Sequence, residues 1–167
     1  MRRGQRDAEF EIYVAAARPR LRRLAYSLCG DWHAADDIVQ TAMAKLYVAW
    51  PRVRRASNPD AYVRRTVART TIDESRRPWR RERSSLDGFD AGDPQSHEGS
   101  DVAARNDLVA ALQRLPEMQR KTVVLRHWLG LSVAETAADL GIAEGTVKSH
   151  TSRALSALHE MMSEAEL

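Results

Sequence analysis

The sequence predicts an all-α protein in which two small helical domains are joined by a flexible acidic linker. Apolar residues recur at three- and four-residue steps over most of the 167 residues, which is the period of helices buried on one face. No segment alternates apolar and polar residues between turn residues, so we expect no sheet. The stretch from Ser84 to about Asp101 shows neither period and is rich in Gly, Ser, Asp and Pro, as linkers are.

These patterns divide the chain into three expected parts. Residues 1–83 form the first domain, residues 84–103 the linker and residues 104–167 the second domain. A hydrophobic share of 43% with 29% charged residues is typical of a soluble globular chain with enough apolar side chains to build cores.

The first two helices are predicted from their apolar stripes. One stripe runs through residues 10–28, and Pro19 inside it should kink or break the helix because proline lacks an amide donor and clashes with the preceding turn. The apolar spacing nevertheless continues across Pro19. Gly30 is expected to end the first helix and Asp31 to start a second helix, which runs to about Trp50.

The third helix and the second domain have their own start signals. Asn58 and Pro59 are expected to be the N-cap and the first residue of a helix that runs from about Asp60 toward Arg77. Beyond the linker, helical spacing returns and is interrupted at Pro116. The apolar residues of this part include Leu108, Leu112, Leu115, Val123, Val124 and Trp128.

The strongest local signal is a helix-turn-helix in the second domain. Ser132 and Glu135 fit a capping box at the start of a short helix, Val133–Leu140. Gly141 then supplies the tight turn, and Glu144–Leu158 forms the second helix. Its inward residues are expected to be Val147, Ala154, Leu155 and Leu158.

The outward face of that second helix carries donors near its N-terminus, where contacts to the major groove usually fall. The expected DNA-facing residues are Glu144, Thr146, Lys148, Ser149, His150, Ser152 and Arg153. A helical hairpin with a solvated polar face is the alternative. The same motif also resembles the output domain of LuxR-type response regulators, but residues 1–83 lack the alternating strands and helices of a phosphoreceiver.

Charge is unevenly distributed although the net charge is only +3. Residues 76–83 hold five arginines, which suits phosphates, whereas residues 84–104 hold five acids and no Lys or Arg. Cys29 is the single cysteine of the chain, so it cannot form an internal disulfide. No apolar stretch approaches the length of a membrane span. We therefore expect a cytoplasmic protein. Cys29 and His33 together make at most half a zinc site, and we interpret both as structural.

Taken together, three motifs resemble the extracytoplasmic-function (ECF) sigma factors of RNA polymerase, in particular an actinobacterial SigE-like group. YSLCGDWHAADDIVQTAMAKLYVAW resembles the helix pair of sigma region 2, and AYVRRTVARTTIDESRR resembles its promoter-melting helix. LVAALQRLPEMQRKTVVLRHWLGLSVAETAADLGIAEGTVKSHTSRAL resembles region 4. The resemblance covers nearly the whole chain and implies a subunit that directs core polymerase to promoters.

What the resemblance implies is a division of labour between the two domains. Region 2 binds the polymerase clamp and captures the minus-10 strand, and region 4 binds the flap and the minus-35 duplex. The implied polymerase-binding residues are Asp36, Asp37, Gln40 and Thr41. The implied minus-10 residues are Arg52, Arg54, Arg55, Asn58, Tyr62, Arg65, Arg69, Thr70, Arg76 and Arg77. Family members commonly have Asn in place of Thr70, which puts a base contact by Thr70 in doubt. Trp50 and Tyr62 are more easily explained as core aromatic residues than as surfaces for base stacking.

Several alternatives stay open at this stage. Asp36 and Asp37 have an alternative explanation as solvated acids favoured by the helix dipole, and a metal-dependent hydrolase, which the sequence favours less, would use the same pair. The acidic linker either mimics RNA in the polymerase channel or is simply solvated. We expect no cofactor, metal or catalytic chemistry, because no phosphate loop or nucleophile-base motif is present. A free-standing helix-turn-helix regulator remains the runner-up, and the sequence leaves open whether an anti-sigma protein holds the chain inactive.

Overall fold

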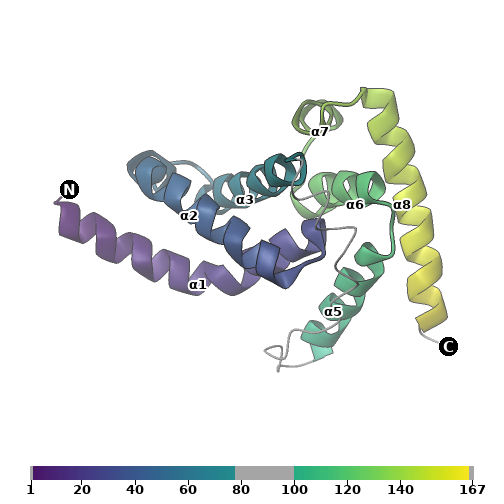
Figure 1. Ribbon diagram of the computed structural model, residues 1–167, viewed down its shortest axis with the longest axis horizontal. Coiled ribbons are helices and arrows are strands. Elements are labelled where there is room, and N and C mark those ends of the chain that lie inside the picture. The colour runs from purple at the N-terminus through teal and green to yellow at the C-terminus, as the bar shows by residue number, and fades with distance from the viewer. Residues whose placement is uncertain (1, 78–99, 166–167) are drawn as a thin grey trace. The chain divides into compact units, whose positions relative to one another are not determined.

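The computed structural model describes residues 2–77 and 100–165, and all regular elements within these two ranges are helices (Figure 1). The chain divides into two compact units, Met1–Asp90 and Ala91–Leu167. The expected fold class is therefore confirmed over the described residues. Most of the expected linker lies outside them, as do Arg80, Arg81 and Arg83. The first described helix of the second unit begins at Ser100, inside the range expected for the linker.

The first unit consists of three mutually packed helices: α1 (Arg3–Cys29), α2 (Trp32–Val53) and α3 (Pro59–Ser75). Each helix turns an apolar face toward the other two. The core side chains are at most 6% exposed and include Leu21, Leu24, Leu28, Ile38, Val39, Leu46, Trp50, Val63, Val67 and Ile72. Burying such side chains is the main stabilising contribution to a unit of this size.

Pro19 does not break the first helix, which runs from Arg3 to Cys29. A proline inside a helix costs about 3 kcal/mol or more. Leu21, Leu24 and Leu28 follow it on the buried face and are each 1% exposed. Burial stabilises by roughly 1.5–3 kcal/mol per side chain. Packing of this face therefore outweighs the cost of the proline.

The helix boundaries of the first unit follow the expected caps. Gly30 adopts the left-handed conformation (φ 72°), and its amide donates to the carbonyl of Tyr26. The Asp31 carboxylate accepts hydrogen bonds from two amides in the first turn of α2. The Asn58 side chain likewise accepts from the Ala61 amide at 3.0 Å, and Pro59 occupies the first turn of α3. Gly30 and Asp31 thus set the turn between α1 and α2, and Asn58 sets where the loop between α2 and α3 ends.

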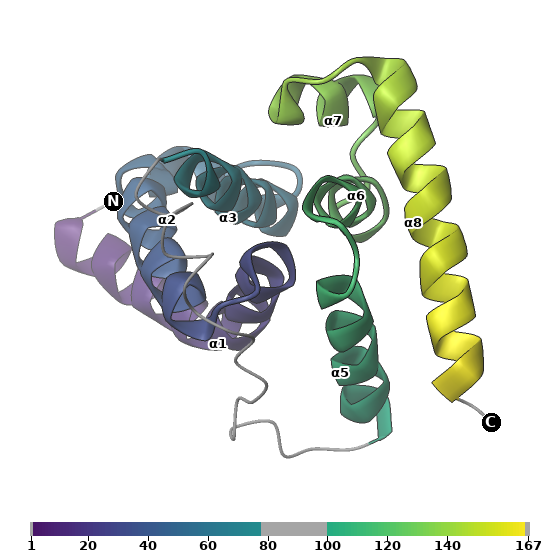
Figure 2. The same cartoon turned by 45° about the vertical axis from the view of Figure 1, so that its right-hand side comes forward.

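The second unit contains α5 (Ser100–Gln113), α6 (Glu117–Val123), a π-helical segment η1 (Val124–Trp128), α7 (Val133–Leu140) and α8 (Glu144–Ala165). Helix α8 packs along α5, α6 and α7 (Figure 2). Pro116 separates α5 from α6 as expected. The sequence did not indicate the π-helix, in which the Leu129 amide donates to the carbonyl of Val124.

The helix-turn-helix of this unit is formed as its sequence predicts. The Ser132 hydroxyl accepts from the Glu135 amide at 3.0 Å, and the Glu135 carboxylate accepts from the Ser132 amide at 2.8 Å. Gly141 ends α7 in the left-handed conformation, at φ 67°. One apolar prediction was wrong, because Leu155, which was expected to face inward, is 43% exposed.

Candidate nucleic-acid interface

One face of α2 is turned away from the core of the first unit. Asp37, Gln40 and Thr41 are all exposed on it, and the Thr41 hydroxyl donates to the backbone carbonyl of Asp37. Ala44 and Val48 continue the same face at three- and four-residue steps. Val48 is 79% exposed, the largest value among the exposed large hydrophobic residues of the described ranges. An apolar side chain amid exposed polar groups makes this face suitable for a protein partner.

Asp36 does not belong to that face. The Arg22 guanidinium donates to both of its carboxylate oxygens, with Nε at 2.6 Å and Nη2 at 3.3 Å. Arg22 also lies over the Trp32 ring, 4.4 Å from its centroid, and Trp32 stacks on Tyr26. The Asp36 carboxylate thus ties α1 to the start of α2, and its assignment to polymerase binding stays a prediction. The sequence analysis missed Arg22 because the pair is fourteen residues apart.

Asp36 and Asp37 also do not converge on one point, since one pairs with Arg22 and the other is exposed. Cys29 donates through its Sγ to the carbonyl of Asp31 at 3.3 Å, which agrees with a structural role. Within residues 2–77 and 100–165, no three His, Cys, Asp or Glu side chains are grouped to hold a metal ion. None of the helices in these ranges has the length and hydropathy that crossing a membrane requires.

The last turn of α2 presents an arginine beside an aromatic ring at the start of α3. Arg52 donates to the Tyr62 hydroxyl at 3.0 Å, and its guanidinium lies 6.0 Å from the centre of the Tyr62 ring. Tyr62 is 38% exposed, so the interpretation of this residue as a core aromatic was wrong. Trp50, in contrast, is 3% exposed and packs against Phe10 and Tyr13, as expected for a core residue.

Asp60 fixes the first turn of α3 against α1. Its carboxylate accepts from the Tyr13 hydroxyl at 2.6 Å and from Arg20 at 2.8 Å. Burial raises the pKa of Tyr13 to about 12, and the hydrogen bond to Asp60 adds to this effect. These contacts hold the N-terminus of α3, and with it Asn58 and Tyr62, in a defined position relative to α1.

The remaining residues expected to contact the minus-10 strand differ in accessibility. Arg55, Asn58, Arg69, Arg76 and Arg77 are exposed, whereas Arg54 and Arg65 are half-buried. Arg54 pairs with Glu9 at 2.5 Å, Arg77 contacts Glu74 at 3.5 Å, and Arg65, Arg69 and Arg76 each have a partner within the chain.

Thr70 is the member of this set that the fold withdraws from solvent. It is 2% exposed, and its hydroxyl donates to the carbonyl of Thr66 at 2.8 Å. The Lys45 ammonium donates to the same hydroxyl oxygen at 3.5 Å. A base contact by this side chain is incompatible with its burial, so we omit Thr70 from the candidate site.

Helix α8 presents its N-terminal half to solvent on one side. Val147, Ala154 and Leu158 form its buried stripe. Glu144, Thr146, Lys148, Ser149, Ser152 and Arg153 are exposed, as the sequence predicts. His150 differs, because it is half-buried at the edge of the stripe and its Nδ1 is enclosed without a hydrogen-bond partner. We therefore do not include His150 among the groups that face outward.

Two family models match the chain in the order of its two units. Residues 13–81 match sigma-70 region 2, and residues 105–158 match sigma-70 region 4. The RNA polymerase sigma-E factor of Streptomyces coelicolor is 37% identical over 155 residues, which cover 91% of this chain and 85% of that protein. The chain belongs to the sigma-70 family. It is therefore a sigma factor and not the free-standing helix-turn-helix regulator that was the alternative.

Further relatives place this sigma factor in the ECF group. The ECF sigma factor EcfG of Rhodopseudomonas palustris is 33% identical over 150 residues, covering 89% of this chain and 82% of the relative. A solved structure of the sigma factor RpoE from Bartonella quintana, in complex with the anti-sigma factor NepR, matches with a TM-score of 0.62 at 28% identity. That match covers 93% of this chain and 97% of the solved one. Neither the matching models nor these relatives belong to a catalytic family.

Proposed function

We propose that the exposed face of α2 binds core RNA polymerase, that the α2–α3 loop and the arginines of α3 hold the minus-10 strand, and that α8 reads the minus-35 duplex. The observation that carries this proposal is the order of the two sigma-70 regions on two separately folded helical units. Such a protein supplies promoter choice and strand capture, and the polymerase supplies the chemistry. This role places it in the cytoplasm with the polymerase.

The polymerase contact is assigned to Asp37, Gln40, Thr41, Ala44 and Val48. An exposed acid and amide suit basic groups on a partner, and Val48 adds apolar area farther along the same face. Exposed apolar area rimmed by polar groups marks sites of protein interaction. Asp36 is left out because Arg22 occupies its carboxylate.

The strand contact is assigned to the loop and to the exposed side of α3. Arg52 and Arg55 supply charge for phosphates, and the exposed Tyr62 ring supplies a surface on which a base can stack. Arginines that already have partners in the fold can still attract a phosphate, since one guanidinium has five donors. The minus-35 contact rests on Lys148, Ser149 and Arg153 at the start of α8.

The test of the polymerase contact is co-elution with core polymerase on a sizing column. The unaltered chain should co-elute, and Asp37→Arg with Gln40→Ala should dissociate while its helical circular dichroism is retained, because both residues are exposed. The comparison variant is Asp139→Arg, which makes the same change of charge at a half-buried acid on α7 of the second unit. Equal affinity of the double variant and the unaltered chain would remove this face from the interface.

An anti-sigma protein is a second proposed partner, on the strength of the RpoE–NepR structure. The test is co-purification of the tagged chain from its own cells, with and without added core polymerase. A protein that the polymerase displaces from the chain would be the expected result.

A further inference from the structure

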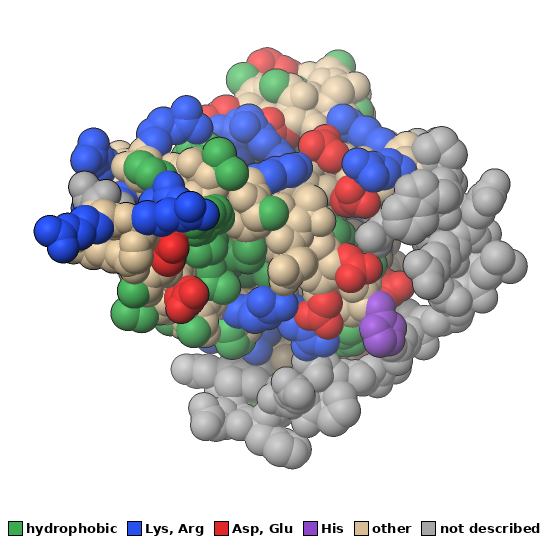
Figure 3. Space-filling model, turned by 60° about the vertical axis from the view of Figure 1, so that its left-hand side comes forward, with side chains coloured by type: hydrophobic (Ala, Val, Ile, Leu, Met, Phe, Trp, Pro, Cys, Tyr) green, Lys and Arg blue, Asp and Glu red, His purple; other side chains and the backbone are tan. Residues whose placement is uncertain are grey.

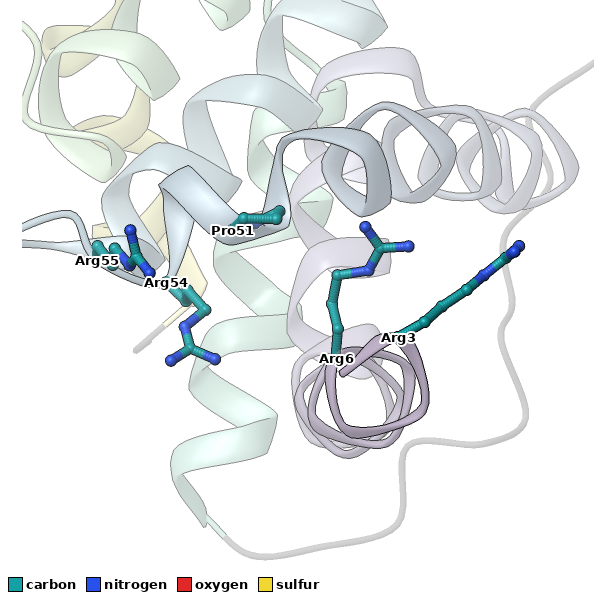
Figure 4. Close-up of a pocket in the computed structure, with 5 residues that line it drawn as sticks. All are labelled: Arg3, Arg6, Pro51, Arg54 and Arg55. Carbon is teal, nitrogen blue, oxygen red and sulfur yellow. The ribbon is translucent and has the colours of Figure 1, made fainter. Parts of the chain in front are cut away.

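A basic pocket lies between the first turn of α1 and the last turn of α2. Its lining residues are Arg3, Arg6, Pro51, Arg54 and Arg55, and its volume is about 440 Å³. Figure 4 shows Arg3 and Arg6 rising from the end of α1, and Arg54 and Arg55 coming from the end of α2 on the other side of Pro51. Segments almost fifty residues apart in the sequence thus contribute to one pocket.

The charges of this pocket are only partly balanced. Asp7 lies 3.7 Å from Arg6, and Glu9 lies 2.5 Å from Arg54, so these two acids offset two of the four guanidinium charges. The Nε of Arg6 is enclosed and has no hydrogen-bond partner, although the same guanidinium donates to the Tyr47 hydroxyl at 2.8 Å. Because this Nε is enclosed and faces the Asp7 carboxylate at 3.7 Å, an added anion would meet the rest of the Arg6 side chain, which is 27% exposed.

The placement of the arginines on α1 also runs against the helix dipole. Arginines near the C-terminus of α2 are ordinary, because cations are favoured at that end of a helix. Arg3 and Arg6 instead lie at the N-terminus of α1, which has no acid in its first turn and no side-chain cap. Both the helix dipole and the open amides there favour an anion. The arginines of the pocket are therefore explained better by a bound anion than by the stability of α1.

The pocket is continuous with the loop assigned to the promoter strand. Arg54 and Arg55 line the pocket, and Arg52 in the last turn of α2 lies beside the exposed Tyr62 ring. Figure 3 brings the side of the molecule with the N-terminus forward and shows Lys and Arg side chains gathered on it. A strand held at Tyr62 has phosphates on both sides of the stacked base, and the pocket lies next to one end of that path.

We propose that the pocket formed by Arg3, Arg6, Arg54 and Arg55 binds a backbone phosphate of promoter DNA next to the segment held by the α2–α3 loop. The first turn of α1 thereby becomes part of the DNA-binding surface. This proposal rests on the proposed function and extends it to residues outside the range that matches sigma-70 region 2, residues 13–81.

The test measures how salt weakens promoter binding by holoenzyme. Promoter fragments are first selected with the unaltered chain and core polymerase, and affinity is then measured from about 0.05 to 0.2 M salt. Each phosphate contact that is lost lowers the slope of log K against log salt by about 0.7 for single-stranded and 0.9 for duplex DNA. We expect part of this decrease for Arg3→Gln and the whole of it for Arg3→Gln with Arg6→Gln, because the two arginines share one phosphate. Arg18→Gln, an exposed arginine farther along α1, should leave the slope unchanged.

Arg6 also contacts the ring and hydroxyl of Tyr47, so a second variant separates charge from packing. Arg6→Lys keeps the charge and should retain most of the salt slope. A slope for Arg6→Lys that falls as far as that of Arg6→Gln would assign the effect to altered packing and would overturn the proposal.

Two further measurements separate other occupants of the pocket. Inorganic phosphate, compared with chloride at equal ionic strength, tests for a free anion through the melting temperature. One contrary result is that phosphate raises the melting temperature of the unaltered chain but not of Arg3→Gln, while the salt slope of promoter binding stays the same in both. That result would identify the occupant of the pocket as a free phosphate compound and not DNA. Loss of core polymerase binding in the same variant would indicate an acidic protein surface instead. Failure of the unaltered chain to bind any promoter with core polymerase would refute the proposed function, whereas equal slopes for Arg3→Gln and Arg18→Gln refute the pocket alone.

Discussion

Truncation of Val48 to alanine should weaken binding to core polymerase about tenfold without destabilising the fold. Val48 is 79% exposed on the face of α2 that carries Asp37 and Gln40. Val48→Ala removes two carbon groups, each of which contributes about 0.8 kcal/mol when buried. If the partner covers the exposed 79% of the side chain, the loss is about 1.3 kcal/mol, or roughly tenfold in Kd.

The assay is titration of fluorescently labelled chain with core polymerase, together with thermal unfolding of the free chain. The free energy of unfolding should change by no more than about 0.5 kcal/mol, because the side chain makes little contact with the core. Ile12→Ala is the matched control, since Ile12 is 73% exposed but lies on α1. Equal affinities of Val48→Ala and the unaltered chain would refute the assignment of this face to the polymerase.

Three further predictions concern readout, capping and pH. Promoter affinity of Lys148→Ala and Arg153→Ala is measured across minus-35 substitutions at several salt concentrations. We expect at least one of the two residues to read a base, so that its variant loses ~1–3 kcal/mol of discrimination at one position. Equal losses at every position for both variants would assign both residues to phosphates. Asn58→Ala should lower the free energy of unfolding of the first unit by about 1 kcal/mol, since the cap to the Ala61 amide is lost, and an unchanged denaturation midpoint would contradict this. The raised pKa of Tyr13 means that the folded chain holds this proton more tightly, so its stabilising effect is complete below about pH 10 and is lost as the pH rises toward 12. Between these values the unaltered chain should lose stability more steeply than Tyr13→Phe, and parallel curves would be the contrary result.

Local signals predicted much of this structure because each one has a local physical cause. The capping box at Ser132 and Glu135, the left-handed Gly141 and the cap at Asn58 each satisfy amides or carbonyls within a few residues. The outward residues of α8 follow from helical spacing alone. Val48 was available to the same reasoning, because it lies off the apolar stripe of α2, although the sequence analysis did not single it out.

Contacts between distant segments were beyond the sequence analysis. Arg22 and Asp36 belong to different helices, and their pairing depends on the angle at the turn after Gly30. Continuity across Pro19 depends on packing against α2 and α3, which outweighs a strong local signal. Leu155 follows directly on the buried Ala154, where spacing alone does not determine exposure, whereas the burial of Thr70 could have been predicted because it is three residues after Val67 on the buried stripe of α3.

The central claim is that this chain gives core RNA polymerase its choice of promoter, and in-vitro transcription on fragments of the host genome tests it most directly. With core polymerase and the unaltered chain, we expect transcripts from a limited set of start sites that share elements near minus 10 and minus 35. Core polymerase alone, or with Asp37→Arg and Gln40→Ala, should not produce them. Site-specific DNA binding by the chain alone, with no dependence of any transcript on its addition, would contradict the claim.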